Sequence, residues 1–433
     1  MTLAGLSLPL GWHVASRTPS DSDLPTVIAA SVDEFLNSLG VNTHADQGYG
    51  AKAYVAPLRY LGVRNIRDGG RNRGGLIMLH RETGVRVDLL GGAASFAIPI
   101  ANILAASGAL LAIEGPNEPN NFPVTYNGRK GGGTESWLAV AELQRDLYQA
   151  VKSDPDLKRY PVFHVSEGGA EMDNVGLQFL AIPAGSSTLL PEGTRFADFA
   201  NPHNYVSGHG NVHVDNQAWH AADPKLASKI WDGLWGEYGK TWKRGFAGYS
   251  DAELETLPRV TTETGWDSVG NPGGERVQGT VLVNTYLSQF KRSWKYTFIY
   301  ELRDNEGGDG HQGLFRDDWS PKPAAVYIHN LTSILGDHSV VSDGGQLEYA
   351  IQGQSAAVHD VLLRKNGSVF DLVIWGERVR GSESVKVKLK SVAETIEIFD
   401  VMVGEQPVEV EHNTAELSLD VSDHALIVQI HKD

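Results

Sequence analysis

The stretch LLAIEGPNEPNNF, at positions 110–122, places a short apolar run directly before a turn rich in glycine, proline, carboxyl and amide groups. An apolar run of this length is typical of a buried strand, and the two prolines stiffen the turn where the strand leaves the core. A stiff turn holds its side chains in fixed positions. The stretch therefore predicts either an ordinary polar loop or a catalytic glutamate at the end of a strand.

Strand-like runs recur between positions 40 and 301, and helical patterns separate most of them. The runs are GVNTH (40–44), VRNIR (63–67), VRVDLL (85–90), LLAIE (110–114), PVFHVS (161–166), FADFANPH (196–203), RVTTE (259–263) and YTFIYE (296–301). The helical patterns cover 53–62, 95–108, 136–153, 275–293 and 322–336. This alternation predicts a parallel (β/α)₈ TIM barrel of the α/β class over residues 32–336. An open doubly wound sheet is the alternative, but no glycine-rich phosphate loop follows the first run.

The pattern changes after Gly336. Runs such as SVKVKLKSV and AELSLDV alternate apolar and polar residues, and turn residues separate them. Such alternation predicts an antiparallel β-sandwich domain over residues 337–433. The N-terminal residues 1–31 precede the barrel, and their strand-like part, 3–14, is expected to join that second domain.

Composition excludes several classes of function. The chain has 433 residues, 53 acidic and 37 basic, and a net charge of −16, which opposes binding to nucleic acid and to anionic membranes. It has no cysteine, so disulfides and thiolate sites are absent. No apolar run reaches transmembrane length. Residues 1–19 do not resemble a signal peptide. A cytoplasmic location is expected unless an export signal has been removed, in which case the protein would be secreted or periplasmic.

Polar side chains follow the predicted strands at their carboxyl ends, where TIM barrels place their active sites. Two glutamates stand out: Glu118 follows the fourth strand, and Glu263 ends the seventh. These two strands face one another across the barrel mouth, so the carboxyl groups are expected to converge. Retaining glycoside hydrolysis needs such a pair, one as acid/base and one as nucleophile, about 5–5.5 Å apart. Further strand-end candidates are His44, Arg67, His203, Tyr205 and Glu301.

The motifs Asn117-Glu118-Pro119 and Thr261-Thr262-Glu263 resemble those of the clan A (β/α)₈ retaining glycoside hydrolases, and a barrel with a β-sandwich is similar to family 39 and its neighbours. The resemblance covers roughly residues 32–336. It implies that Glu118 is the acid/base, protonated at first because Glu263 raises its pKa, and that Glu263 is the nucleophile.

The same resemblance assigns further roles. Asn117 would bind the sugar 2-hydroxyl, His203 and Tyr205 would be the polar pair after the sixth strand, and Arg67 would be the arginine after the second. The clan usually ends its eighth strand with a tryptophan, whereas this chain has Tyr300-Glu301. Trp266 is the expected sugar platform because it lies close to Glu263 in sequence.

Other interpretations stay open. Glu114 is expected to be a structural partner, and Glu167 and Glu301 are rival carboxyl groups. HGNVH (209–213) has histidines four residues apart, but its glycines favour a loop, so no metal is predicted. The predicted function is cleavage of a β-linked oligo- or polysaccharide without a cofactor. The alternatives are a carbohydrate-binding barrel without turnover and a transglycosylase that uses the same two glutamates. The oligomeric state is not predicted.

Overall fold

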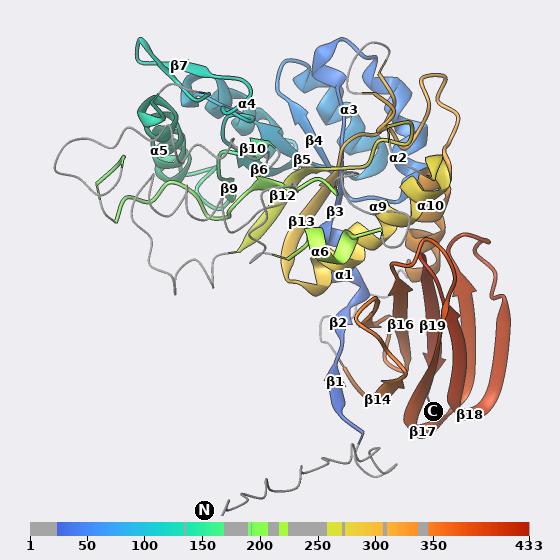
Figure 1. Cartoon of the computed structure of the whole chain (residues 1–433). Helices are drawn as coiled ribbons and strands as arrows, with labels where there is room; N and C mark the ends of the chain where they lie inside the picture. Colours follow the sequence, from blue (N-terminus) through green and yellow to red (C-terminus); the bar gives the residue numbers. More distant parts are fainter. Residues whose placement is uncertain are drawn as a thin grey trace, which may run out of the picture.

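The structure is a computed structural model that describes residues 24–133, 136–168, 189–191, 193–206, 216–223, 258–270, 273–305, 310–336 and 345–432. Two parts are visible in Figure 1. Parallel strands ringed by helices form the larger part, and antiparallel strands from the C-terminal end of the chain, orange to red, form the smaller one. The predicted residues 3–14 and HGNVH (209–213) lie outside the described residues.

The larger part is built on a parallel sheet in the order β12-β13-β3-β4-β5-β6-β9. Its strands are β3 (Leu39–Asn42), β4 (Asn65–Gly69), β5 (Arg86–Leu90), β6 (Leu110–Glu114), β9 (Val162–Phe163), β12 (Arg259–Thr264) and β13 (Trp294–Ile299). Most residues of these strands are buried, polar ones included, because helices cover the outer face and side chains fill the inside. All seven correspond to runs predicted from the sequence.

The sixth position of the ring is held by an irregular segment around Phe199. Isolated parallel bridges pair Phe163 with Phe199 on one side and Ala200 with Arg259 on the other. The backbone N–H of His164 donates to the carbonyl of Phe199 at 3.0 Å, and that of Val260 donates to the carbonyl of Ala200 at 2.9 Å. These contacts link β9 to β12 and close the sheet into a barrel, which confirms the predicted fold class.

Helices follow the strands as predicted, with three additions. The described helices are α1 (Val32–Ser38), α2 (Val55–Leu61), α3 (Arg73–Thr83), α4 (Ala94–Ala106), α5 (Leu138–Ser153), α6 (Ala218–Ala221), α9 (Gly274–Lys291) and α10 (Pro323–Leu335). Helices α1, α3 and α6 were not predicted. In α3, two glycines lower helix propensity, but Asn72 caps the first turn through the N–H of Gly75, and Leu76 and Leu79 are buried. Packing therefore outweighs propensity there.

The smaller part is an antiparallel sheet with a hydrophobic core of its own. It contains β14 (Gln346–Gln352), β15 (Val358–Arg364), β16 (Val369–Gly376), β17 (Glu383–Asp400), β18 (Glu409–Val421) and β19 (Ala425–His431). The long β17 pairs with β14 through its first half and with β19 through its second half. The strands β1 (Thr26–Ile28) and β2 (Ala30–Ser31), from the N-terminal side, pair with β14 and β15. The predicted antiparallel architecture of this region is confirmed.

The two parts share a continuous interface at α9 and α10. Residues of both helices belong to one hydrophobic cluster with Val373, Trp375 and Ile427 of the C-terminal sheet. Arg276 on α9 forms two hydrogen bonds, of 3.0 and 2.8 Å, with the carboxylate of Asp423. The interface lies away from the carboxyl ends of the barrel strands, so the sheet supports the barrel without entering its mouth. Within the described ranges, no helix combines the length and apolar character needed to span a bilayer.

Candidate active site

A cavity of about 470 Å³ lies at the carboxyl ends of the barrel strands. The connecting loops contain the short elements η1 (Ala45–Gln47), η2 (Ala51–Tyr54), β7 (Val124–Tyr126), β8 (Arg129–Gly131), β10 (Glu167–Gly168) and β11 (Pro202–His203). Of these, η1 and β10 contribute residues to the cavity lining. Its lining includes Asn42, His44, Asp46, Arg67, Asp68, Asn117, Glu118, Asn121, Phe122, Tyr205, Glu263, Tyr300 and Gln312. Six of the nine residues predicted for the site therefore face one cavity: His44, Arg67, Asn117, Glu118, Tyr205 and Glu263.

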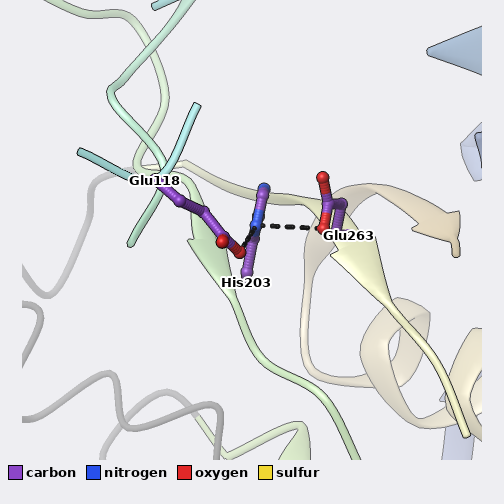
Figure 2. A group of neighbouring side chains, drawn as sticks. All are labelled: Glu118, His203 and Glu263. Carbon is purple, nitrogen blue, oxygen red and sulfur yellow. Dashed lines mark hydrogen bonds and ion pairs between the residues drawn. The ribbon is translucent and has the colours of Figure 1, made fainter. Parts of the chain in front are cut away.

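The carboxyl groups of Glu118 and Glu263 converge on His203 (Figure 2). One oxygen of each carboxyl group and Nδ1 of His203 all lie within 4.8 Å of one another. Nδ1 is 2.6 Å from Oε1 of Glu118 and 3.4 Å from Oε2 of Glu263. Both glutamates are 8% exposed, so each carboxyl group reaches the cavity but is largely withdrawn from bulk water.

The loop that carries Glu118 is held by hydrogen bonds to its surroundings. The N–H of Glu118 donates to Oγ of Ser166 at 3.2 Å. The side chain of Asn120 forms two hydrogen bonds with the backbone of Gly168, at 2.9 and 3.1 Å. Glu118 itself has a φ of 39°, a left-handed conformation that costs a residue with a Cβ about 1–3 kcal/mol. These contacts maintain that conformation and fix the direction of the Glu118 side chain.

Gly168 provides the surface on which the carboxyl group of Glu118 rests. A Cβ atom at this position would lie 2.3 Å from the carboxyl carbon of Glu118, so only glycine permits the approach. The parallel pairing of β10 with β11 aligns Gly168 with His203. A glycine in one short strand and a histidine in the next thus bring Glu118 and His203 into contact.

Arg67 at the carboxyl end of β4 uses all of its N–H groups within the protein. Nε and Nη2 donate to the two oxygens of Glu114 at 2.6 and 2.9 Å. Nη1 donates to Glu263 at 2.5 Å and to Asn42 at 3.1 Å, and Nη2 also donates to Asn117 at 2.7 Å. A guanidinium has five N–H donors, and all five have partners within the protein. These contacts position Glu263 and Asn117. Arg67 also lines the cavity, so its contact with a substrate stays a prediction.

Glu114 was predicted to be a structural partner, and it lies fully buried beneath the cavity. Burial opposes its ionisation, but the adjacent Arg67 guanidinium lowers the pKa of Glu114 below its ordinary value. The neighbouring Asp88 shows the opposite shift. Burial and the Glu114 carboxylate raise the pKa of Asp88 well above its ordinary value. The floor of the site thus holds one ionised and one neutral carboxyl group beside a single guanidinium.

His203 is 1% exposed and does not line the cavity, so it contacts the glutamates and not a substrate. The hydroxyl of Thr262 donates to Glu114 or to Asn201, each at 3.0 Å. Both of these partners are acceptors only. Thr262 must therefore accept from Nε2 of His203, 2.9 Å away, and Nδ1 is the nitrogen that exchanges a proton with Glu118.

The charge on His203 decides the protonation of Glu118. Burial opposes the imidazolium, but the Glu263 and Glu118 carboxylates raise the pKa of His203 above 6.5. Burial likewise favours the neutral form of Glu118, but the hydrogen bond from His203 lowers the pKa of Glu118 below 4.5. The predicted rise caused by Glu263 is therefore wrong in direction. The 2.6 Å contact between Nδ1 of His203 and Oε1 of Glu118 gives a direct route for a proton to reach Glu118.

Tyr205 donates its hydroxyl to Oε2 of Glu263 at 2.9 Å. Burial and the Glu263 carboxylate raise the pKa of Tyr205 well above 10, so the phenol keeps its proton. With Arg67 on the other oxygen, Glu263 has one donor on each side. These donors hold the carboxylate in one orientation.

His44, which follows β3, and Glu301, which follows β13, form a pair beside the cavity. His44 lines the cavity and contacts Glu301 through Nδ1 at 2.9 Å. Burial opposes its charge, but Glu301 raises the pKa of His44 above its ordinary value. Glu301 is only 1% exposed and lies outside the cavity lining. The structure thus corrects the prediction for Glu301, which orients His44 and is not reached by a substrate.

Trp266 is not brought to the cavity. Its ring is 1% exposed and belongs to the main hydrophobic cluster, and its carbonyl accepts from the side chain of Gln278 on α9 at 2.9 Å. A fully buried ring has no face available for stacking on a sugar, which corrects the prediction of a platform. Tyr300, at the end of the eighth strand, lines the cavity instead. Glu167 begins β10, and its side chain is not among those described.

The lining also contains residues that the sequence analysis did not select: Asn42, Asp46, Asp68, Asn121, Phe122 and Gln312. Asn42 was detectable, because it is the last residue of β3 and therefore lies at a strand end. Asp46 and Phe122 lie several residues beyond their strands, where loop geometry decides which way a side chain faces. Sequence position alone carries no signal for them.

Glu118, His203 and Glu263 are also the described residues whose ligand atoms come close enough to suggest a metal site. The contact between Nδ1 of His203 and Oε1 of Glu118 is 2.6 Å, which is a hydrogen-bond distance. Two ligands on one tetrahedral zinc ion, each about 2.0 Å from it, would be about 3.3 Å apart. The arrangement fits a shared proton better than a shared cation.

The sequence matches no protein-family model and no curated protein. Solved structures share the fold. A family 39 glycoside hydrolase from Bacteroides cellulosilyticus WH2 superposes with a TM-score of 0.55 at 16% identity, covering 94% of this chain and 83% of that one. CelM2, a bifunctional glucanase-xylanase from a metagenome library, gives a TM-score of 0.57 at 11% identity, with coverage of 94% and 99%.

A GH30 endoxylanase from Clostridium papyrosolvens C71 gives a TM-score of 0.51 at 10% identity, with coverage of 92% and 96%. The likeness extends over almost the whole chain in each case, so the barrel and the antiparallel sheet both take part. The chain therefore has the fold seen in clan A glycoside hydrolases of families 39 and 30.

Proposed function

We propose that this protein is a retaining β-glycoside hydrolase in which Glu263 is the nucleophile and Glu118 the acid/base. The observation that carries the proposal is the approach of the two carboxyl groups, with one oxygen of each inside a 4.8 Å cluster. Retaining enzymes need about 5–5.5 Å between these groups, whereas inverting enzymes need about 6.5–9.5 Å to admit a water between them. The short separation favours direct attack by a carboxylate.

In the first half of the reaction, the carboxylate of Glu263 attacks the anomeric carbon of the sugar. The glycosidic C–O bond breaks, and the leaving oxygen takes the proton of Glu118, which reaches that residue from Nδ1 of His203. The donors Arg67 and Tyr205 hold Glu263 in the orientation for attack. The product of this half is a covalent glycosyl-enzyme and a free alcohol.

In the second half, Glu118 is a carboxylate and takes a proton from water while the water attacks the anomeric carbon. The ester bond to Glu263 breaks and the sugar leaves with retained configuration. Esterified Glu263 carries no charge, so in the glycosyl-enzyme the largest influence that raises the pKa of His203 is absent, which favours the earlier loss of the Nδ1 proton. When Glu263 is released as a carboxylate, the pKa of His203 rises again, and the proton that Glu118 took from water returns to Nδ1 for the next cycle.

Asn117 is suited to bind the sugar hydroxyl next to the reacting carbon. Its Oδ1 accepts from Arg67 at 2.7 Å, which fixes the orientation of the amide. Among the described residues, no hydrogen bond engages its Nδ2, so this donor remains for a substrate. Such a hydrogen bond strengthens as charge develops on the ring in the transition state.

The charges of the cavity favour neutral sugars. Four carboxyl groups face it, from Asp46, Asp68, Glu118 and Glu263. Arg67 offers no free donor, and the charge of His44 is balanced by Glu301. A uronic acid would bring another carboxylate into this surrounding, and the described lining residues offer no unpaired cation to bind it. We therefore propose neutral β-linked glucosides or xylosides, the substrate types named for CelM2, as substrates.

The decisive experiment is azide rescue in two variants. Glu263→Ala should lower turnover of an aryl β-glycoside by on the order of 10³-fold or more. Azide should then enter from the face that Glu263 vacates and give the α-glycosyl azide. Glu118→Ala should instead form a β-glycosyl azide, because Glu263 still attacks first and azide then replaces it.

The surface substitution Glu82→Ala is the matched control, since this glutamate lies on the exposed end of α3. NMR of the first product formed by the wild-type enzyme gives the stereochemistry. An unimpaired Glu263→Ala variant, or a product of inverted configuration, would refute the proposal. A panel of β-glucosides, β-xylosides and β-glucuronides tests the substrate class, and turnover of the glucuronides alone would contradict a preference for neutral sugars.

A further inference from the structure

We infer that Phe122 is a binding platform for the leaving group, stacking on the flat apolar face of the sugar or aryl ring that departs. The inference rests on the proposed function, because the side of the cavity that receives the leaving group is defined by the acid/base. It concerns a residue that neither the sequence motifs nor the fold assigns. Three features of the structure support it: the exposure of the ring, its attachment to the Glu118 loop, and its side of the cavity.

Phe122 lines the cavity and is 62% exposed. The two tyrosines in the lining are less accessible to a ligand. Tyr300 is only 9% exposed, and Tyr205 donates its hydroxyl to Glu263. Phenylalanine has no polar group that gains from contact with water. A bare phenyl ring at the edge of a polar cavity is therefore a surface that a ligand with an apolar face would cover.

The backbone that presents this ring is fixed. The N–H groups of Asn121 and Phe122 donate to the carbonyl of Glu118 at 2.9 and 2.7 Å, which closes a tight turn. The side chain of Asn121 donates to the carboxyl group of Glu118 at 3.0 Å. The N–H of Gly133 ties the same loop from outside through the carbonyl of Pro119 at 2.8 Å. A ring on a fixed backbone binds a ligand without the entropic cost of first ordering a loop.

The position of the Phe122 ring relative to the two glutamates indicates which part of the substrate it would contact. Glu263 approaches the sugar that becomes covalently bound, and Glu118 donates its proton to the oxygen of the group that leaves. Phe122 belongs to the turn built on Glu118, next to Asn121 and on the side of the acid/base. The group attached to the leaving oxygen extends past Glu118, where this ring lies. His44 and Asp46, which also line the cavity, follow β3, and β4 and β5 separate that strand from β6, so this more distant side remains for the sugar that stays on the enzyme.

The test compares substrates that share one sugar but differ in the leaving group. The probes are the glycosyl fluoride, the 4-nitrophenyl glycoside and the disaccharide of a neutral sugar that the wild-type enzyme cleaves. Phe122→Ala should lower kcat/KM about tenfold for the disaccharide and the nitrophenyl glycoside, since each offers a ring to stack. It should leave the fluoride within about twofold, because fluoride has no ring to lose. Phe122→Trp should keep the wild-type order of all three.

The disaccharide and the aryl glycoside distinguish a sugar from an aryl leaving group, and the larger loss identifies the preferred ring. Phe96→Ala, which removes a 43% exposed ring on α4 outside the cavity, is the matched control. Equal losses on all three substrates, or no loss on any, would overturn the inference while leaving the hydrolase proposal intact. A wild-type enzyme inactive on every β-glycoside tested would instead refute the proposed function, and this inference with it.

Discussion

The guanidinium of Arg67 is the side chain on which the site depends most for its shape. It joins Asn42 on β3, Glu114 on β6, Glu263 on β12 and Asn117 in the acid/base loop. Its donors therefore fix four segments of chain relative to one another. Arginine is suited to this because its planar group makes paired hydrogen bonds with carboxylates, whereas a lysine ammonium has three donors on a flexible stem.

Arg67→Lys is therefore expected to impair both stability and activity. The lysine keeps the charge but leaves buried carboxylate oxygens of Glu114 and Glu263 without donors, at a cost of about 3 kcal/mol in the free energy of unfolding. Denaturant unfolding and kcat/KM on one β-glycoside measure the two effects. Arg59→Lys is the control, because the Arg59–Glu82 pair is exposed and should change stability by less than about 1 kcal/mol. Equal effects of the two substitutions would contradict the role given to Arg67.

His203 is expected to set the alkaline limit of activity. Its raised pKa means that the proton shared with Glu118 is lost only as pH rises through the histidine value. In His203→Asn, Glu118 alone can hold the proton, and the ordinary pKa of a carboxylic acid is lower than that of histidine. The alkaline limb of kcat/KM should therefore move to lower pH, and kcat/KM at pH 7 should fall about 10²-fold. Profiles measured from pH 4 to 10 test this, and an alkaline limb that stays in place would refute it.

At the scale of the elements, the sequence predicts the barrel strands well and their side-chain directions less well. The runs 63–67, 85–90 and 110–114 are strands whose β-branched and leucine residues are buried in the barrel, although Arg67 and Asp88 interrupt two of them. The sixth run, 196–203, is largely irregular and pairs through isolated bridges, a detail that depends on its neighbours. Helix α3 escapes prediction because its glycines suggest a loop, whereas burial of two leucines decides.

The candidate site was predictable where a residue stands at a strand end, and not where a contact depends on the assembled fold. Glu263 follows from its strand position, and Glu118, four residues beyond β6, follows from the Asn117-Glu118-Pro119 motif as well. The partners of Arg67 come from three segments far apart in the sequence, around Asn42, Glu114 to Asn117, and Glu263, which no local pattern reveals. Trp266 and Glu301 also stand near strand ends, yet both are buried. Proximity in sequence does not indicate whether a side chain turns into the cavity or into the core.

Helices α9 and α10 pack closely at Gly279, and this contact gives a prediction. Alanine normally stabilises a helix over glycine by up to about 1 kcal/mol. Here, a Cβ atom would lie 2.6 Å from the ring of Tyr327 and 3.1 Å from the backbone nitrogen of Ala324. Overpacking typically costs about 1–3 kcal/mol, so Gly279→Ala should lower the free energy of unfolding on balance.

Gly74→Ala is the matched substitution, because that glycine lies in α3 and a Cβ would meet nothing within 4 Å. It should raise the free energy of unfolding by only a few tenths of a kcal/mol, because Gly74 lies close to the helix end, where helix propensity has its smallest effect. Chemical denaturation of both variants measures the difference. Stabilisation of similar size in both would show that α9 and α10 can separate at no cost.

At the scale of the whole molecule, the barrel and the C-terminal sheet share one hydrophobic cluster and a polar junction. Asp423 of the sheet binds Arg276, and its carbonyl accepts from Asn284 of α9. The side chain of Asn330 on α10 donates to the carbonyl of Val401 at the end of β17. These contacts tie both helices to the same end of the sheet, where β17 and β18 end and β19 begins. The sheet is therefore expected to contribute to the stability of the barrel and to unfold with it.

His424 lies on the sheet side of this junction, beside Asp423, and should make stability depend on pH. It bonds Asp400 at 3.1 Å and lies beside Asp423, and although burial opposes its charge, the two carboxylates raise the pKa of His424 to about 9. A group with a raised pKa in the folded state stabilises fully below its unfolded value, about 6.5, and loses that contribution as pH rises through about 9. The full contribution is roughly 3 kcal/mol.

His424→Gln should therefore lower the free energy of unfolding by up to about 3 kcal/mol at pH 6, and its difference from the wild type should shrink steadily and nearly vanish by about pH 10. Denaturant unfolding at a series of pH values measures this. His412→Gln, on the exposed face of the edge strand β18, is the control and should run parallel to the wild type. A constant difference between His424→Gln and the wild type across that range would mean that the imidazole packs at the junction without carrying a charge there.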